Sequence, residues 1–141
     1  MTIAFDTTVV VAALCSWHEH HGAAHAALDS ALAGGVLVIP DHALGESWSV
    51  LTRLPPPHRL PPDVAWRLLE ANLGECPVGC LPPGKTWELL ERLRDARIVG
   101  GAAWDVRVCE EALAGGATGI VTLNVRHFVQ VAPPGLAVRA P

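Results

Sequence analysis

Short apolar runs alternate with longer amphipathic segments along the whole chain. Five runs are too short and too rich in β-branched residues for helices, and we expect them to be strands: TIAFD, VLVIP, CPVGCL, GIVTLN and GLAVRA. Apolar residues at helical spacing predict helices over residues 19–33, 41–54, 61–73, 86–96 and 102–114. The segment TTVVVAAL follows the first strand up to a break near Ser16. This alternation is typical of an α/β/α sandwich around a mainly parallel sheet of four to five short strands.

The same spacing predicts which helical faces are buried. The expected inward residues are Leu44, Trp48 and Leu51 in the segment 41–54, and Trp87, Leu90 and Leu93 in the segment 86–96. Asp41 is placed to cap the helix that follows VLVIP. No helix is expected after GIVTLN, where we place His127 in a loop beside a buried Phe128.

Composition limits the class of protein. With 141 residues, half of them apolar, we expect a single folded domain over residues 1–141. No apolar run is long enough to span a membrane, and no signal segment is visible, so we expect a cytoplasmic protein with reduced cysteines. Cys76 and Cys80 have no second pair to complete a zinc site. The net charge of −4 argues against a passive nucleic-acid binder, although acids gathered around a metal ion fit it.

Four polar residues are expected to meet at one edge of the sheet. Asp6 and Asn124 end two predicted strands, and Glu46 and Asp105 lie early in two predicted helices. Asp105 also begins an apolar stripe, where a carboxylate is costly unless a cation meets it. Each residue has an ordinary alternative: a turn former at Asp6 or Asn124, a solvated flank at Glu46, a helix-dipole partner at Asp105. Together they indicate a metal site.

Four segments carry a resemblance to a known family. FDTTVVVAAL, GESWSVLTRL, WDVRVCEEAL and GIVTLNVRHF, in this order, resemble the PIN-domain ribonucleases, specifically the VapC-like toxins of bacterial type II (VapBC) toxin–antitoxin systems. The likeness runs from residue 3 to about residue 128. It implies a PIN-like fold, an acidic pocket that binds Mg²⁺ or Mn²⁺, and cleavage of RNA. It also implies a homodimer and a VapB-like antitoxin whose peptide fills the acidic groove.

The resemblance assigns roles to individual residues. Asp6, Glu46 and Asp105 match the family's first three acids, as catalytic residues and metal ligands. Asn124 stands where many members have an acid, so it would be a neutral ligand, which leaves the number of metal ions open. Thr8 and Thr122 lie beside the acids and are placed to donate hydrogen bonds to them. Water activated by the metal would hydrolyse the phosphodiester, and Arg53, Arg107 and Arg126 are candidates for guiding RNA.

The histidine-rich stretch from His18 to His25 suggests a different metal site. His21 and His25 have the i, i+4 spacing of a zinc pair, but no third ligand follows at a useful spacing. The alternative is that both lie half-buried and hydrogen-bonded at the edge of an apolar helix face. We therefore place the metal with the carboxylates.

Two other functions remain open at this stage. A degenerate PIN domain, with Asn124 in place of an acid, would bind RNA or protein without cutting it. A haloacid-dehalogenase-like phosphatase is suggested by FDTT, but Thr8 stands where that family needs a second Asp.

Overall fold

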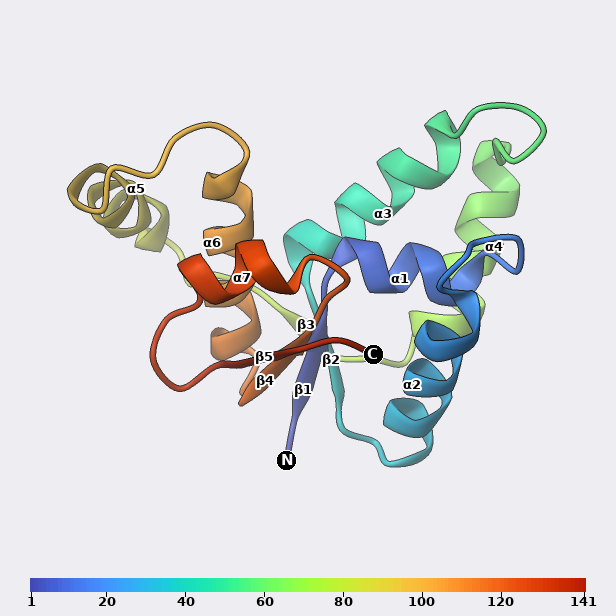
Figure 1. Cartoon of the computed structure of the whole chain (residues 1–141), viewed down its shortest axis with the longest axis horizontal. Coiled ribbons are helices and arrows are strands. Elements are labelled where there is room, and N and C mark those ends of the chain that lie inside the picture. The colour runs from blue at the N-terminus through green and yellow to red at the C-terminus, as the bar shows by residue number, and fades with distance from the viewer.

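The computed structural model describes residues 1–141 as five strands and seven helices (Figure 1). The strands are β1 (Ile3–Phe5), β2 (Leu37–Pro40), β3 (Val78–Gly79), β4 (Gly119–Val121) and β5 (Ala137–Arg139). The helices are α1 (Thr7–Leu14), α2 (His21–Ala33), α3 (Asp41–Arg53), α4 (Pro62–Leu73), α5 (Lys85–Asp95), α6 (Ala102–Ala114) and α7 (Val125–Val131). The predicted α/β class is confirmed. None of the helices combines the length and hydropathy that a membrane span requires.

The sheet has the strand order β3-β2-β1-β4-β5, and every neighbouring pair is parallel. The carboxyl ends of its strands therefore meet at one edge, where α/β proteins place their ligands. At the centre, Phe5 of β1 lies beside Val121 of β4. The residues that follow these strands, Asp6 and Thr122, are consequently neighbours at that edge.

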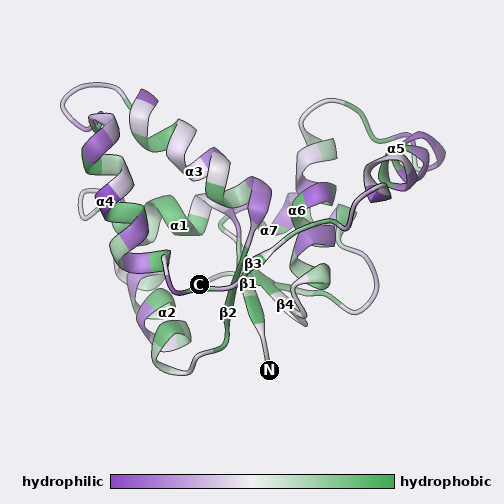
Figure 2. Ribbon diagram, turned by 180° about the vertical axis from the view of Figure 1, so that it is seen from behind, coloured by the Kyte–Doolittle hydropathy of each residue, from purple (hydrophilic) through white to green (hydrophobic).

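Helices cover both faces of the sheet. Figure 1 shows α1 to α4 on one side and α5 to α7 on the other. Phe5 and Ile39 point into the core beneath α1, α2, α3 and α4, whereas Val38 and Ile120 point into the core beneath α6 and α7. The strands are correspondingly hydrophobic in Figure 2, while α5, at the outside, is largely hydrophilic.

Two predicted helix faces are wrong in part. In α5 the buried residues are Leu89 and Leu93, whereas Trp87 is 75% exposed and Leu90 is 45% exposed. Helix α5 packs through one narrow stripe, so only leucines one turn apart are buried. In α3, Trp48 is 37% exposed because smaller residues, Ala43 and Ser47, share the buried face with Leu51. In both helices, bulky apolar residues were predicted to be buried, but smaller or neighbouring residues occupy the buried face.

Two further corrections concern helix ends. Asp41 does not cap α3: Pro40 occupies the N-cap, and Asp41 lies in the first turn without a capping hydrogen bond. The strand expected to reach Asn124 ends at Val121, and the expected loop around His127 is helix α7. Phe128 is buried as expected and anchors α7 in the core beneath α6.

Candidate active site

Asp6 occupies the centre of the carboxyl edge as a buried, hydrogen-bonded carboxylate. It is the N-cap of α1, and its Oδ1 accepts hydrogen bonds from the backbone N–H of Val9 at 3.2 Å and from the Thr8 hydroxyl at 2.7 Å. Its Oδ2 accepts from the Thr122 hydroxyl at 2.9 Å. Asp6 is 4% exposed. Both oxygens are therefore oriented by the protein.

The two threonines also tie Asp6 to the connection between β4 and α7. Thr8 Oγ1 accepts a hydrogen bond from the backbone N–H of Leu123 at 3.0 Å, and Thr122 Oγ1 accepts one from that of Asn124 at 2.9 Å. Each hydroxyl thus accepts from one backbone group and donates to the carboxylate, and such chained bonds polarise one another. The positions of β1 and β4 are linked at this point.

The acids at this edge repel one another. Burial, together with the charge of Asp105, raises the pKa of Asp6 from 3.8 to about 6, despite the three hydrogen bonds that lower it. Burial also raises the pKa of Asp105, and Glu46 raises it further, while His127 and His42 oppose the shift. Asp6, Asp105 and Glu46 therefore form a chain of electrostatic neighbours. A cation would relieve the repulsion between them.

The ligand set is not preassembled. No three His, Cys, Asp or Glu side chains converge as metal ligands anywhere in the structure. Glu46 is on α3, with its side chain 42% exposed, and its Oε2 lies 3.4 Å from His42 Nε2. Asn124 is exposed at the start of α7, where its side chain caps nothing. Burial and the charge of Asp105 raise the pKa of the Cys109 thiol to about 12, which excludes Cys109 as a nucleophile.

The sequence did not reveal Glu111, which joins the two helices that carry Glu46 and Asp105. Glu111 is fully buried on α6; its Oε1 accepts from Arg107 Nε at 2.8 Å and its Oε2 from the backbone N–H of His42 at 2.7 Å. One carboxylate thus links α6 to the first turn of α3. The i, i+4 spacing of Arg107 and Glu111 was the only available signal.

His42 and Trp104 were also missed, since His42 belongs to no motif and Trp104 only begins the segment WDVRVCEEAL. Their rings stack with centroids 4.7 Å apart and planes 5° apart. The stack borders a hollow of about 730 Å³ whose lining includes Asp41, Glu46 and Arg53. A second hollow, of about 480 Å³, includes Asp105 and His127. The acidic edge is therefore open on both sides of the first turn of α6.

The histidine-rich stretch has a structural role. His21 Nδ1 lies 2.9 Å from the carbonyl oxygen of Ala12, and His25 Nδ1 lies 3.3 Å from that of Ala13. A carbonyl only accepts, so each Nδ1 donates, and the two rings stack 5.0 Å apart. They satisfy carbonyls in the last turn of α1 that the helix itself leaves unbonded.

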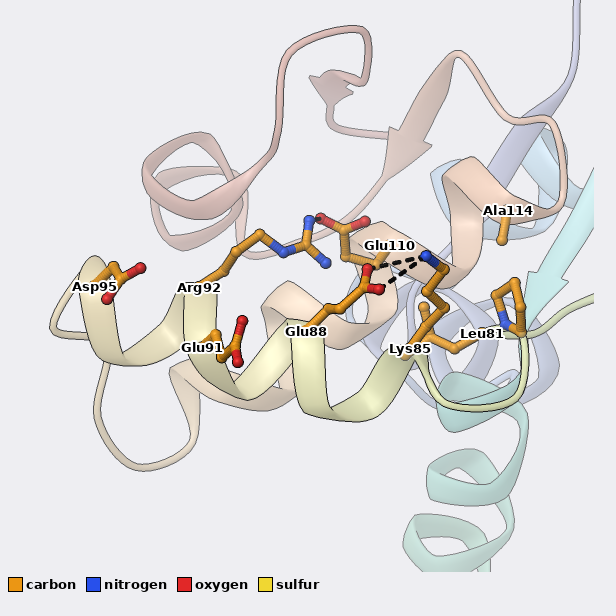
Figure 3. A pocket seen from close by; sticks show the side chains of 9 residues that line it. Leu81, Lys85, Glu88, Glu91, Arg92, Asp95, Glu110 and Ala114 are labelled. Atoms are coloured by element: carbon orange, nitrogen blue, oxygen red, sulfur yellow. Dashed lines mark hydrogen bonds and ion pairs between the residues drawn. The ribbon is translucent and has the colours of Figure 1, made fainter.

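A charged hollow of about 550 Å³ lies between α5 and α6, away from the strand ends (Figure 3). Its carboxylates are largely neutralised within the protein. Lys85 Nζ lies 3.0 Å from both oxygens of Glu88, and Arg92 pairs with Glu110. Asp95 pairs with Arg94, so only the exposed Glu91 lacks an ion-pair partner among the acids of this hollow.

Comparisons with known proteins show the family to which this chain belongs. Residues 3–132 match the PIN domain family. Ribonuclease VapC40 of Mycobacterium tuberculosis is 42% identical over 124 residues, which cover 88% of this chain and 87% of VapC40. Ribonuclease VapC27 of the same species is 39% identical over 107 residues, covering 75% of this chain and 73% of VapC27.

Two solved structures share the fold at 18% sequence identity. VapBC2 from Rickettsia felis, bound to a DNA fragment from its promoter, superposes with a TM-score of 0.70 over 100% of this chain and 99% of the other. Mycobacterium tuberculosis VapC20, a toxin that cleaves the sarcin–ricin loop, superposes with a TM-score of 0.62 over 94% and 97%. Together with the sequence matches, they show that this chain belongs to the PIN-domain family and, within it, to the VapC ribonuclease toxins of toxin–antitoxin systems.

Proposed function

We propose that this ribonuclease is a metal-dependent endonuclease whose reaction takes place at Asp6, Glu46 and Asp105. The observation that carries the proposal is Asp6 itself: a buried carboxylate, with a pKa raised to about 6, beside a second acid whose pKa is also raised. Protein interiors avoid such an arrangement unless it serves a function. Carboxylate oxygens are the ligands that Mg²⁺ and Mn²⁺ prefer, so the donor set fits either ion.

In the proposed reaction each residue has a separate task. When bound, a divalent ion supplies Lewis acidity towards a phosphate oxygen and eases deprotonation of a water. Asp6 presents a carboxylate held rigid by Thr8 and Thr122, and Asp105 adds the second charge. Glu46, half-exposed, accepts the proton of the attacking water. Asn124 offers a neutral amide oxygen and no charge, which favours one tightly bound ion over two.

The RNA phosphate reaches this edge from solvent. Arg53, exposed in the hollow that also contains Glu46, offers a cation for it. We propose that the protein acts in the cytoplasm, where its RNA substrate would be found.

We also propose that a cognate VapB-like antitoxin binds beside the acids. An apolar groove of about 330 Å³ runs between α3 and α4, with Trp48 and Trp66 exposed along it. Leu44 and Gly45 border both this groove and the hollow that contains Glu46. An antitoxin segment lying in the groove would therefore end at the acidic edge. Leu90 and Val99, exposed on and after α5, are candidates for a homodimer contact.

The deciding experiment uses the chain purified free of antitoxin. Total RNA is incubated with the protein and Mn²⁺, Mg²⁺ or EDTA, and Asp6→Asn is compared with Asp95→Asn, an exposed aspartate on α5 paired with Arg94. We expect discrete fragments that require metal, persist in Asp95→Asn and vanish in Asp6→Asn. If folded protein cuts nothing with either metal, the nuclease proposal fails, and a domain that binds RNA without cutting it takes its place.

A further inference from the structure

We propose that the His42–Trp104 stack is a binding platform for one RNA base beside the scissile phosphate. The inference rests on the proposed function and adds a nucleotide subsite to it. Trp104 is 52% exposed although His42 covers part of it. One face of the indole is therefore backed by a second ring, and about half of the residue remains exposed to solvent.

Contacts with α6 and with Glu46 hold the His42–Trp104 stack in place. The backbone N–H of His42 donates to the buried Glu111, which fixes the first turn of α3 against α6. The His42 ring is then confined between Trp104 and Glu46, whose Oε2 lies 3.4 Å from Nε2. That Nε2 is buried and makes no hydrogen bond, so the stack on Trp104 and the contact with Glu46 hold the ring in position. A base would meet a surface that is already ordered, which lowers the entropic cost of binding.

The surroundings of the stack fit a nucleotide. The hollow beside it has about 730 Å³, within the range of small-ligand sites. Arg53 lies on the same lining and offers a cation to the phosphate. Trp104 and Glu46 line the same hollow, so a base on the indole brings its backbone near the acidic edge. Single-stranded RNA is commonly held by stacking of its bases on aromatic side chains.

A second histidine–tryptophan stack provides a matched comparison. Trp17 and His58 stack with centroids 4.0 Å apart and planes 20° apart, and Trp17 is 45% exposed. This pair joins the loop after α1 to the loop after α3, at the end of α1 opposite Asp6. It has the same ring chemistry without an adjacent carboxylate, so its removal controls for the loss of an exposed tryptophan.

The test measures binding of a short fluorescent single-stranded RNA by anisotropy, with Asp6→Asn as the parent so that no RNA is cut. We expect Trp104→Ala to weaken binding about tenfold, the scale of one base–aromatic stack, and Trp104→Phe to retain most of it. Trp17→Ala should bind like the parent. Equal binding by Trp104→Ala and the parent, or equal losses in Trp104→Ala and Trp17→Ala, would overturn the platform.

An abasic scan identifies the base. Abasic sites are placed at each position of the RNA in turn, and one of them should weaken binding to the parent while causing no further loss in Trp104→Ala. Additive losses at every position contradict the inference. If Trp104→Ala weakens binding of an antitoxin peptide and leaves RNA binding unchanged, the surface belongs to the antitoxin and the inference fails.

Cleavage by the chain with native Asp6 is scored separately. If the chain cuts RNA with metal but Trp104→Ala does not weaken RNA binding, only the proposed base platform fails and the nuclease proposal stands. If the abasic scan links one base to Trp104 but no RNA is cut, the nuclease proposal fails and Trp104 remains a base-binding site.

Discussion

The two ends of helix α1 are both bonded by polar side chains, but their chemistry differs. At its C-terminal end, His21 and His25 donate to the carbonyls of Ala12 and Ala13 and stack on each other. At its N-terminal end, Asp6 accepts three hydrogen bonds, yet burial and Asp105 still raise its pKa to about 6. The histidine end is satisfied within the protein. The aspartate end retains a charge cost that hydrogen bonds do not offset.

This difference explains why a cluster of histidines in the sequence is a poor guide to the metal site. Four of the seven histidines lie in one short stretch, whereas the acids are scattered over the chain and meet only through the fold. A concentration of possible metal ligands is no sign of a site when each has its own partner. Like charges brought together in a buried place are a stronger sign, because folding alone gives no reason for them.

The largest expected effect is on RNA cleavage, which should depend on the acids at the Asp6 end of α1 and not on the histidines at its other end. Asp105→Asn should reduce RNA cleavage about 10²- to 10³-fold, because it removes several kcal/mol of electrostatic stabilisation at the reacting phosphate. The double variant His21→Ala with His25→Ala should cut at close to the parental rate. Initial rates on a defined RNA at saturating Mn²⁺ measure both. Loss of cleavage in a folded histidine variant would reverse the assignment of the two ends.

Asp6 should also make the metal-free protein less stable as the pH rises. The folded state keeps the Asp6 proton up to about pH 6, while the unfolded chain releases it near 3.8. Between these values the folded state binds more protons, so its stability falls with rising pH, by about 3 kcal/mol in total.

Asp6→Asn removes this cost and keeps a good N-cap. In EDTA at pH 7 the inactive variant should therefore be more stable than the parent, and its advantage should vanish near pH 4. Urea unfolding at several pH values measures the difference. A variant that is less stable than the parent at every pH would show that the Asp6 charge is not costly.

A metal ion should stabilise the folded protein by binding at Asp6, and not at His21 and His25. Mn²⁺ at one hundred times its dissociation constant should raise the free energy of unfolding by about 2.7 kcal/mol. Asp6→Asn should lose most of this gain, whereas the double histidine variant should keep it. Thermal unfolding with and without Mn²⁺ provides the comparison. An unchanged gain in Asp6→Asn would place the ion elsewhere.

The sequence was a good guide to what depends on local pattern. Asp6 after the end of β1, and Glu46 and Asp105 in the early turns of α3 and α6, could be expected near one another because parallel strands share one carboxyl edge. Helix α7 was missed because Val125, Val129 and Val131 favour a strand by propensity, and the burial of Phe128 is a tertiary effect.

Other parts of the site depend on contacts between distant segments. Glu111 meets His42 across 69 positions of the chain, and the ring of His42 meets Trp104 from a different helix. No spacing rule encodes such pairs. In α5 the choice between two adjacent apolar stripes was likewise decided by packing, which buried Leu89 and Leu93 and left Trp87 exposed.

The smallest expected effect concerns the histidine end as a helix cap. His21→Ala should lower the free energy of unfolding by about 1 kcal/mol, because the Ala12 carbonyl loses its hydrogen bond close to the protein surface. His25→Ala should cost less, since its bond to Ala13 is longer, at 3.3 Å, and its side chain is half-exposed. His21→Gln, with an amide that can still donate, should recover part of the loss. Denaturant unfolding in EDTA gives all three values. If the same losses appeared only when zinc was present, the histidines would be ligands and not caps, and the contrast between the two ends of α1 would not hold.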